Sequence, residues 1–132
     1  TIGPSTFSYP ITSGITVGLN YRFQIIAKSN GGETLGNTVS TIVADIPDTP
    51  VTAPTLVQSE TTQTQIRVDY AVVAGDGGSP ILSYQLQRSN GAGSSFFDVI
   101  GSDSNLTLST SYTIQELTKG TAYRFRYRAK NS

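Results

Sequence analysis

Apolar and polar residues alternate along three runs of this chain, and no stretch shows sustained helical periodicity. The runs are residues 65–70, 84–87 and 123–130. In each run every second side chain is apolar, which predicts a strand with one buried face and one face in water. The predicted core consists of Ile66, Val68, Tyr70, Tyr84, Leu86, Ile114, Leu117, Tyr123, Phe125 and Tyr127. The pattern therefore indicates an all-β fold.

Glycine, proline and asparagine separate these runs. Residues 75–80, with the sequence GDGGSP, predict a loop, and residues 30–32 and 90–93 predict tight turns, because Asn-Gly supplies the positive φ of a hairpin. Residues 46–54 contain three prolines. Since proline cannot donate a hydrogen bond to a central strand, this stretch predicts an extended linker that runs into an edge strand.

An internal repeat changes the expected domain count. Residues 18–28 align with residues 120–130, a spacing of 102 positions, and Gly, Tyr, Arg, Phe, Ala and Lys recur at matching places. Residues 9–11 also resemble residues 112–114 if one residue is inserted in the first copy. A spacing near 100 is typical of one β-sandwich domain. We therefore expect the chain to begin inside one copy and to end inside the next.

Composition narrows the chemistry that this chain can perform. The 132 residues carry no net charge, since nine Lys and Arg balance nine Asp and Glu, so nothing steers the chain toward nucleic acid. Histidine, cysteine, methionine and tryptophan are absent, which excludes disulfides, thiol chemistry and imidazole metal sites. The 16 serines and 18 threonines favour a hydroxyl-rich β surface. The longest purely apolar run, residues 70–74, is far too short to span a membrane.

At the repeated positions the chain resembles fibronectin type III repeats. In that family a Leu stands six residues before a Tyr at the start of strand F, and an aromatic and basic alternation ends in Ala and Asn. The second copy matches at Leu117, Gly120, Tyr123, Phe125, Ala129 and Asn131, and the first at Ile15, Gly18, Tyr21, Phe23 and Ala27. Where the family has a Trp at the end of strand B, this chain has Tyr70, whose hydroxyl needs water or a carbonyl as partner.

The resemblance implies a tandem immunoglobulin-like β-sandwich made of two antiparallel sheets. Residues 1–46 would supply strands E to G of a first repeat, residues 47–54 a Pro-rich junction, and residues 50–132 a second repeat that lacks its last strand. Tyr21 and Tyr123 would each form a tyrosine corner, with the hydroxyl bonded to backbone a few residues upstream. The open edge would be completed by its own chain or by a neighbour, and the sequence leaves these two alternatives open.

Three features are candidates for sites. Asn105 begins an Asn-Leu-Thr acceptor pattern for glycosylation. A second candidate is the basic row, which we define as Arg124, Arg126, Arg128 and Lys130 on one strand face; the alternative is a solvated face balanced by acids such as Asp69 and Glu116. Phe96 and Phe97 point to opposite faces of a strand, so that one of them faces solvent or a partner.

The glycine-rich loop at Asp76 and the polar loop at Asp103 supply too few carboxylates for calcium, so turn roles are expected for both residues. No catalytic motif and no cofactor-binding motif is present, which argues against an enzyme. We therefore expect a structural, glycosylated repeat of an extracellular or cell-surface fibre, whose partners are neighbouring copies or adjacent repeats, and glycans. A protein- or carbohydrate-binding module of a receptor, adhesin or multidomain enzyme is one alternative, and an intracellular ciliary or cytoskeletal spacer is another.

Overall fold

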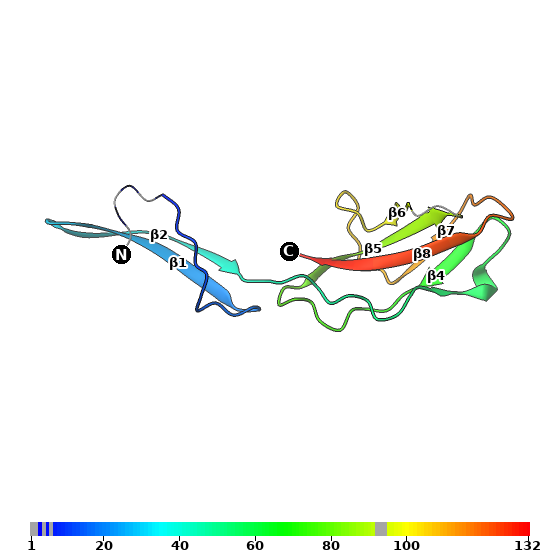
Figure 1. The fold of residues 1–132 in the computed structure, drawn as a ribbon, viewed down its shortest axis with the longest axis horizontal. Helices are drawn as coiled ribbons and strands as arrows, with labels where there is room; N and C mark the ends of the chain where they lie inside the picture. Colours follow the sequence, from blue (N-terminus) through cyan, green and yellow to red (C-terminus); the bar gives the residue numbers. More distant parts are fainter. Residues whose placement is uncertain (1–2, 4, 6, 92–94) are drawn as a thin grey trace.

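The structure, a computed structural model, describes residues 3, 5, 7–91 and 95–132, and it consists of a hairpin and a sandwich that lie end to end (Figure 1). The hairpin pairs β1 (Asn20–Ser29) with β2 (Gly32–Ile42). The sandwich contains β3 (Thr55–Leu56), the 3-10 turn η1 (Gln58–Glu60), β4 (Ile66–Asp69), β5 (Ile81–Asn90), β6 (Phe97–Ile100), β7 (Ser111–Ile114) and β8 (Tyr123–Asn131). Its two sheets have the orders β3-β4-β7 and β6-β5-β8. Every strand pair is antiparallel, and no α-helix occurs among the described residues, which confirms the predicted all-β class.

The sandwich core lies between the two sheets and follows the period-two pattern. Seven of the ten predicted core residues are buried, namely Val68, Tyr70, Tyr84, Leu86, Ile114, Leu117 and Tyr127. The other three, Ile66, Tyr123 and Phe125, are half-buried and pack against this cluster. Leu86 has no exposed surface because β5 is the central strand of its sheet, between β6 and β8. The core is therefore centred on β5, as expected for a strand that is covered on both edges.

Tyr70, Tyr84 and Tyr127 form an aromatic cluster where the family pattern has a Trp. The ring centroids of Tyr70 and Tyr127 are 4.9 Å apart, and those of Tyr70 and Tyr84 are 6.5 Å apart. The Tyr70 hydroxyl is buried, and it has no hydrogen-bond partner among the described residues. The ring therefore fills the core, and of the two expected partners of the hydroxyl, water or a carbonyl, no carbonyl of the described residues is in place.

Tyr70→Phe is expected to raise the free energy of unfolding by about 1 kcal/mol, because it removes a buried hydroxyl without a protein partner. Burial also raises the pKa of Tyr70 above its ordinary 10.0. Ionisation of Tyr70 therefore leaves the stability of the parent unchanged below pH 10 and lowers it as the pH rises from 10 through the raised value, so the advantage of the variant should grow at alkaline pH. Urea unfolding of both proteins at neutral and alkaline pH checks this, and a less stable variant at neutral pH would contradict it.

The hairpin follows its predicted turn but buries little. Ser29 pairs with Gly32 across the Asn30-Gly31 turn, and the register shifts between Gln24 and Ile26. Every residue of β2 is exposed, and Ile25, Leu35 and Val39 are 76%, 64% and 62% exposed. A two-stranded hairpin with such open apolar side chains needs a second layer for stability.

One part of the expected organisation differs in the structure. Residues 1–46 were expected to supply strands E to G, and residues 9–11 resemble residues 112–114 of β7, but residues 7–19 form no strand. Their counterpart β7 is held by β4, and among the described residues the hairpin has no strand equivalent to β4. β5 ends at Asn90, and β6 begins at Phe97. Of the predicted turn at 90–93, residues 92 and 93 lie outside the described residues.

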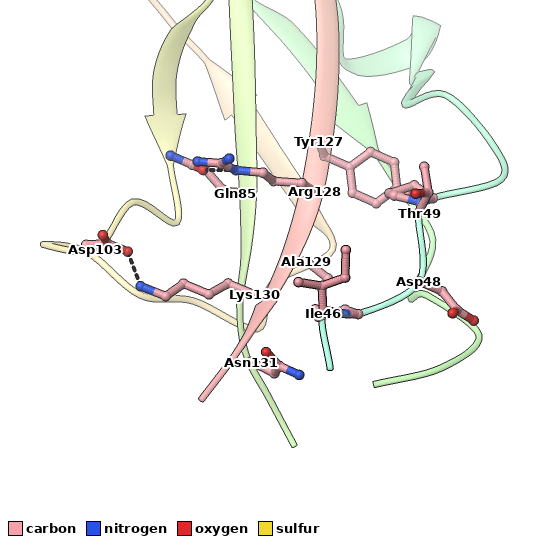
Figure 2. A pocket seen from close by; sticks show the side chains of 12 residues that line it. Ile46, Asp48, Thr49, Gln85, Asp103, Tyr127, Arg128, Ala129, Lys130 and Asn131 are labelled. Atoms are coloured by element: carbon pink, nitrogen blue, oxygen red, sulfur yellow. Dashed lines mark hydrogen bonds and ion pairs between the residues drawn. The ribbon is translucent and has the colours of Figure 1, made fainter. Parts of the chain in front are cut away.

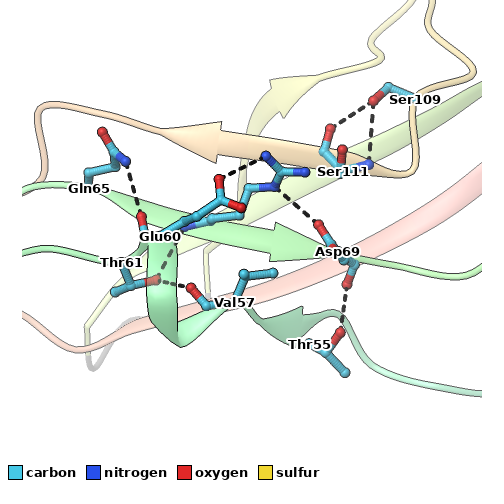
Figure 3. Close-up of polar contacts among 9 residues, drawn as sticks. Thr55, Val57, Glu60, Thr61, Gln65, Asp69, Ser109 and Ser111 are labelled. Carbon is cyan, nitrogen blue, oxygen red and sulfur yellow. Dashed lines mark hydrogen bonds and ion pairs between the residues drawn. The ribbon is translucent and has the colours of Figure 1, made fainter.

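The outer face of the β3-β4-β7 sheet is held by polar contacts around Arg67 on β4. Its guanidinium donates to Glu60 Oε2 at 3.1 Å and to Asp69 Oδ1 at 3.2 Å. The Thr61 hydroxyl donates to the Val57 carbonyl at 2.9 Å and so closes η1 (Figure 3). Asp69 is thus bound by Arg67 on its own strand, and the expectation that Asp69 balances the basic row is wrong.

Candidate functional site

The basic row lies on the outer face of the β6-β5-β8 sheet. Tyr127 between the row's residues points into the core, so alternation turns the cationic side chains outward. The Arg126 guanidinium donates to Gln87 Oε1 at 2.8 Å. The Arg128 guanidinium donates to Gln85 Oε1 at 2.6 Å, as Figure 2 shows. Both glutamines belong to the neighbouring strand β5. Much of the row is therefore bonded within its own sheet.

Lys130 at the end of the basic row forms an ion pair with Asp103 in the loop after β6 (Figure 2). Hydrogen bonding and charge from the Lys130 ammonium hold the pKa of Asp103 below its ordinary value. Asp103 thus serves to fasten a loop to β8. Asp76 accepts a hydrogen bond from the Gly78 N–H at 2.8 Å, which is the turn role expected for it.

The side chains of Phe96 and Phe97 have different surroundings, as expected for neighbours in an extended segment. The Arg126 guanidinium carbon lies 4.1 Å from the centroid of the half-buried Phe96 ring, a cation–π contact. Phe97 is 56% exposed. Phe96 thus belongs with the basic row, whereas Phe97 presents an open aromatic side chain.

Asn105 is exposed in a bend of the loop between β6 and β7. Its backbone N–H donates to the Ser102 carbonyl at 2.9 Å. The N–H of Thr107, the third residue of the acceptor pattern, donates to the buried Ser83 hydroxyl at 3.0 Å. The loop therefore anchors Thr107 while it leaves the Asn105 side chain accessible.

A groove of about 550 Å³ runs beside β8, and sequence reasoning missed it. Its walls are residues 46–50 of the linker and residues 127–131 of β8, with Gln85 and Asp103 (Figure 2). In the described part of the chain no strand pairs with the outer edge of β8. The sequence pointed to this groove only indirectly. The predicted absence of a last strand implies an open sheet edge, but it does not show that the linker faces that edge.

Tyr21 and Tyr123 occupy matching settings. The Thr16 N–H donates to the Tyr21 hydroxyl at 2.8 Å, and the Thr118 N–H donates to the Tyr123 hydroxyl at 3.0 Å. Each donor stands five residues upstream of its tyrosine. The Thr118 N–H favours the phenolate and thereby lowers the pKa of Tyr123.

Tyr123→Phe is expected to lower the melting temperature by about 4 °C, because the Thr118 N–H loses its acceptor. Thermal unfolding followed by circular dichroism measures this effect. Tyr9→Phe is the matched control, since Tyr9 is 66% exposed. Equal melting temperatures for the Tyr123 variant and the parent would contradict a stabilising role of the contact.

The described residues contain no group of three or more His, Cys, Asp or Glu side chains that could hold a metal ion. No helix among them is long and apolar enough to cross a membrane.

Two antiparallel sheets packed around an aromatic and aliphatic core define an immunoglobulin-like sandwich. The family model of the Fibronectin type III domain matches residues 52–132, and the chain belongs to this family. It is similar to a crystal structure of domains A168-A170 from titin, with 23% identity and a TM-score of 0.71 over 99% of this chain and 45% of that one. It is also similar to a structure of titin kinase and its flanking domains, with 26% identity and a TM-score of 0.56 over 67% of this chain and 15% of that one. The chain thus spans less than half the length of either structure.

Proposed function

We propose that this chain is a non-catalytic structural module of a tandem array, which stacks on neighbouring repeats through end-to-end and strand contacts. The observation that carries the proposal is one local structure that occurs twice, 102 residues apart. A positive-φ glycine, Gly18 or Gly120, precedes a tyrosine whose hydroxyl accepts the N–H five residues upstream. The hairpin and the sandwich lie end to end, as consecutive repeats of an array would (Figure 1).

The open apolar face of the hairpin supports the same reading. Val39 pairs with Phe23 and so lies on the same hairpin face as Ile25, and these two side chains are 62% and 76% exposed, whereas Tyr127, the repeat counterpart of Ile25, is buried in the sandwich. A second sheet over the hairpin would bury these side chains and complete a first repeat.

The edge of β8 supports strand contacts. β1, the counterpart of β8, pairs with β2 along nearly its whole length, but the same edge of β8 has no strand partner among the described residues. An unpaired edge accepts another strand readily, and the groove beside β8 leaves room for one.

Electron microscopy of the protein purified from its native source tests the array. We expect elongated particles in which units of similar size follow one another in a line. Compact particles without such units would overturn the proposal.

We place the module in an extracellular or cell-surface fibre because Asn105 is exposed within an acceptor pattern. Mass spectrometry of the native protein should find a glycan on Asn105. An unmodified Asn105 would instead favour the second candidate, an intracellular scaffold spacer, which the likeness to titin domains fits.

The alternative of a binding module for proteins or carbohydrates draws on the basic row and on Phe96 and Phe97. Arg126, Arg128 and Lys130 already have partners in Gln87, Gln85 and Asp103, so an acidic ligand would have to displace those contacts. We therefore place the binding module after both structural candidates.

A further inference from the structure

The hairpin and the sandwich meet at a contact in which main-chain groups of two segments bond to each other directly. We define the docking loop as residues 75–79, between β4 and β5, and the exit segment as residues 43–48, which leaves β2. The Asp45 N–H donates to the Gly77 carbonyl at 2.8 Å, and the Asp48 N–H donates to the Gly75 carbonyl at 3.0 Å. The docking loop therefore binds the main chain of the exit segment through two hydrogen bonds, and the Asp48 side chain lies beside Gly75.

Asn131 bridges the two sides of the contact from the end of β8. Its side-chain amide donates to the Asp45 carbonyl and to the Asp76 carbonyl, each at 2.7 Å. One donor group thus joins the exit segment, the docking loop and the last strand of the sandwich. Beside it, the hydroxyls of Ser79 and Ser132 contact each other and tie the loop to the chain after β8.

Two glycines make this close approach possible. A Cβ on Gly77 would lie 2.2 Å from the Asp45 carbonyl oxygen and 2.7 Å from that of Ile46. A Cβ on Gly78 would lie 2.5 Å from the Gly18 nitrogen, in the turn before β1. Both clashes are with backbone, which cannot rotate away as a long side chain can. The space between the two units therefore excludes any side chain at positions 77 and 78.

We propose that the docking loop and Asn131 form a specific docking surface for the end of the preceding unit, which holds the two units in one fixed orientation. The partner it fits is a main-chain surface composed of a glycine turn and an extended exit segment, as Gly18 and residues 43–48 provide. This inference rests on the proposed function only in regarding the hairpin as part of an adjacent repeat. The contact itself is within the chain and does not depend on an array.

The docking surface has a direction. Gly120 is the repeat counterpart of Gly18, and nothing lies within 4 Å of the position its Cβ would take. The sandwich therefore carries the docking loop next to the hairpin and an open glycine turn at the start of β8. The docking loop of a following unit would contact the Gly120 turn as the docking loop of this sandwich contacts Gly18.

Spin-label distance measurements on the whole chain test the fixed orientation. The chain has no cysteine, so labels at Thr38→Cys on β2 and Lys119→Cys before β8, both exposed positions, report the relative placement of the two units. We expect one narrow distance distribution in the parent. Gly77→Ala or Gly78→Ala should broaden it at least about twofold, because the units separate.

Gly120→Ala is the matched control. Gly120 has φ +78 and Gly77 has φ +74, so both variants impose the same backbone strain, but only the alanine at 77 meets the first unit. Asn131→Ala is the second variant, since it strains no glycine and still removes both bridging hydrogen bonds; it should broaden the distribution as Gly77→Ala does.

A broad distribution in the parent, or variants at 77 and 131 as narrow as the Gly120 control, would overturn the inference. Neither result would touch the proposed array, which electron microscopy tests separately. Compact particles in the microscope together with a narrow parent distribution would overturn the array and leave the docking surface intact.

Discussion

Leu86→Ala is expected to lower the free energy of unfolding of the sandwich by about 3–5 kcal/mol, because the deleted atoms leave a cavity in a closed core. Leu86 has no exposed surface, and it pairs with Ile100 of β6 and Tyr127 of β8. Neither neighbour can move inward without breaking its ladder with β5. Since domains of this size are stable by only about 5–15 kcal/mol, the variant should lose a large part of its stability.

Urea unfolding followed by circular dichroism measures the loss. Leu82→Ala is the control on the same strand, because Leu82 is 41% exposed at an irregularity in the β5–β8 register. The control should lose much less stability. Similar losses in the two variants would show that Leu86 is not at the centre of the core.

Gly101→Ala should have the second large effect, because position 101 combines a positive φ with a closed space. Its φ is +82, and an added Cβ would lie 2.0 Å from the Tyr84 carbonyl oxygen and 2.9 Å from the Gln85 Cα. The Gly101 carbonyl also accepts the hydroxyl of the buried Ser83 at 2.9 Å, so the backbone cannot shift freely. We expect a loss of about 3–5 kcal/mol, from backbone strain and from overpacking together.

Gly120→Ala separates these two causes. Gly120 has a similar φ of +78, but an added Cβ meets nothing within 4 Å. This control should lose only about 1–2 kcal/mol, from backbone strain alone. The same urea titration compares both variants with the parent, and equal losses would contradict the steric explanation at Gly101.

The core of the sandwich could be predicted because the alternation of apolar and polar residues within each strand shows by itself which side chains are buried. Alternation along β4, β5 and β8 places Val68, Leu86 and Tyr127 inward whatever the neighbouring strands are. Tyr123 and Phe125 were predicted as core residues but are only half-buried, since both lie near the open end and edge of β8, which the alternation along the strand does not reveal.

The partners of the candidate site could not be predicted because they depend on register between distant strands. Arg128 meets Gln85 across 43 residues, and Lys130 meets Asp103 across 27. Only the β5–β8 register and the path of the loop after β6 decide these pairs. The expected balance by Asp69 was therefore wrong, because Arg67, two residues away on the same strand, reaches that carboxylate first.

The docking loop illustrates a different limit. Its Gly and Asp residues predicted a loop, but the sequence does not show that the Gly77 and Gly78 positions face another unit and not water. The failed strand at residues 9–11 has a related cause, since a strand forms only where a partner strand supplies its hydrogen bonds.

The backbone contact between Gly77 and Asp45 has a geometric consequence for any longer chain of such units. Main-chain contacts of this kind tolerate changes in most side chains, so the same twist and tilt would recur at each junction. Equal rotations added one after another wind a row of units into a superhelix of constant pitch. A single alanine at position 77 would then act as one loose joint in that superhelix and leave the pitch on either side unchanged.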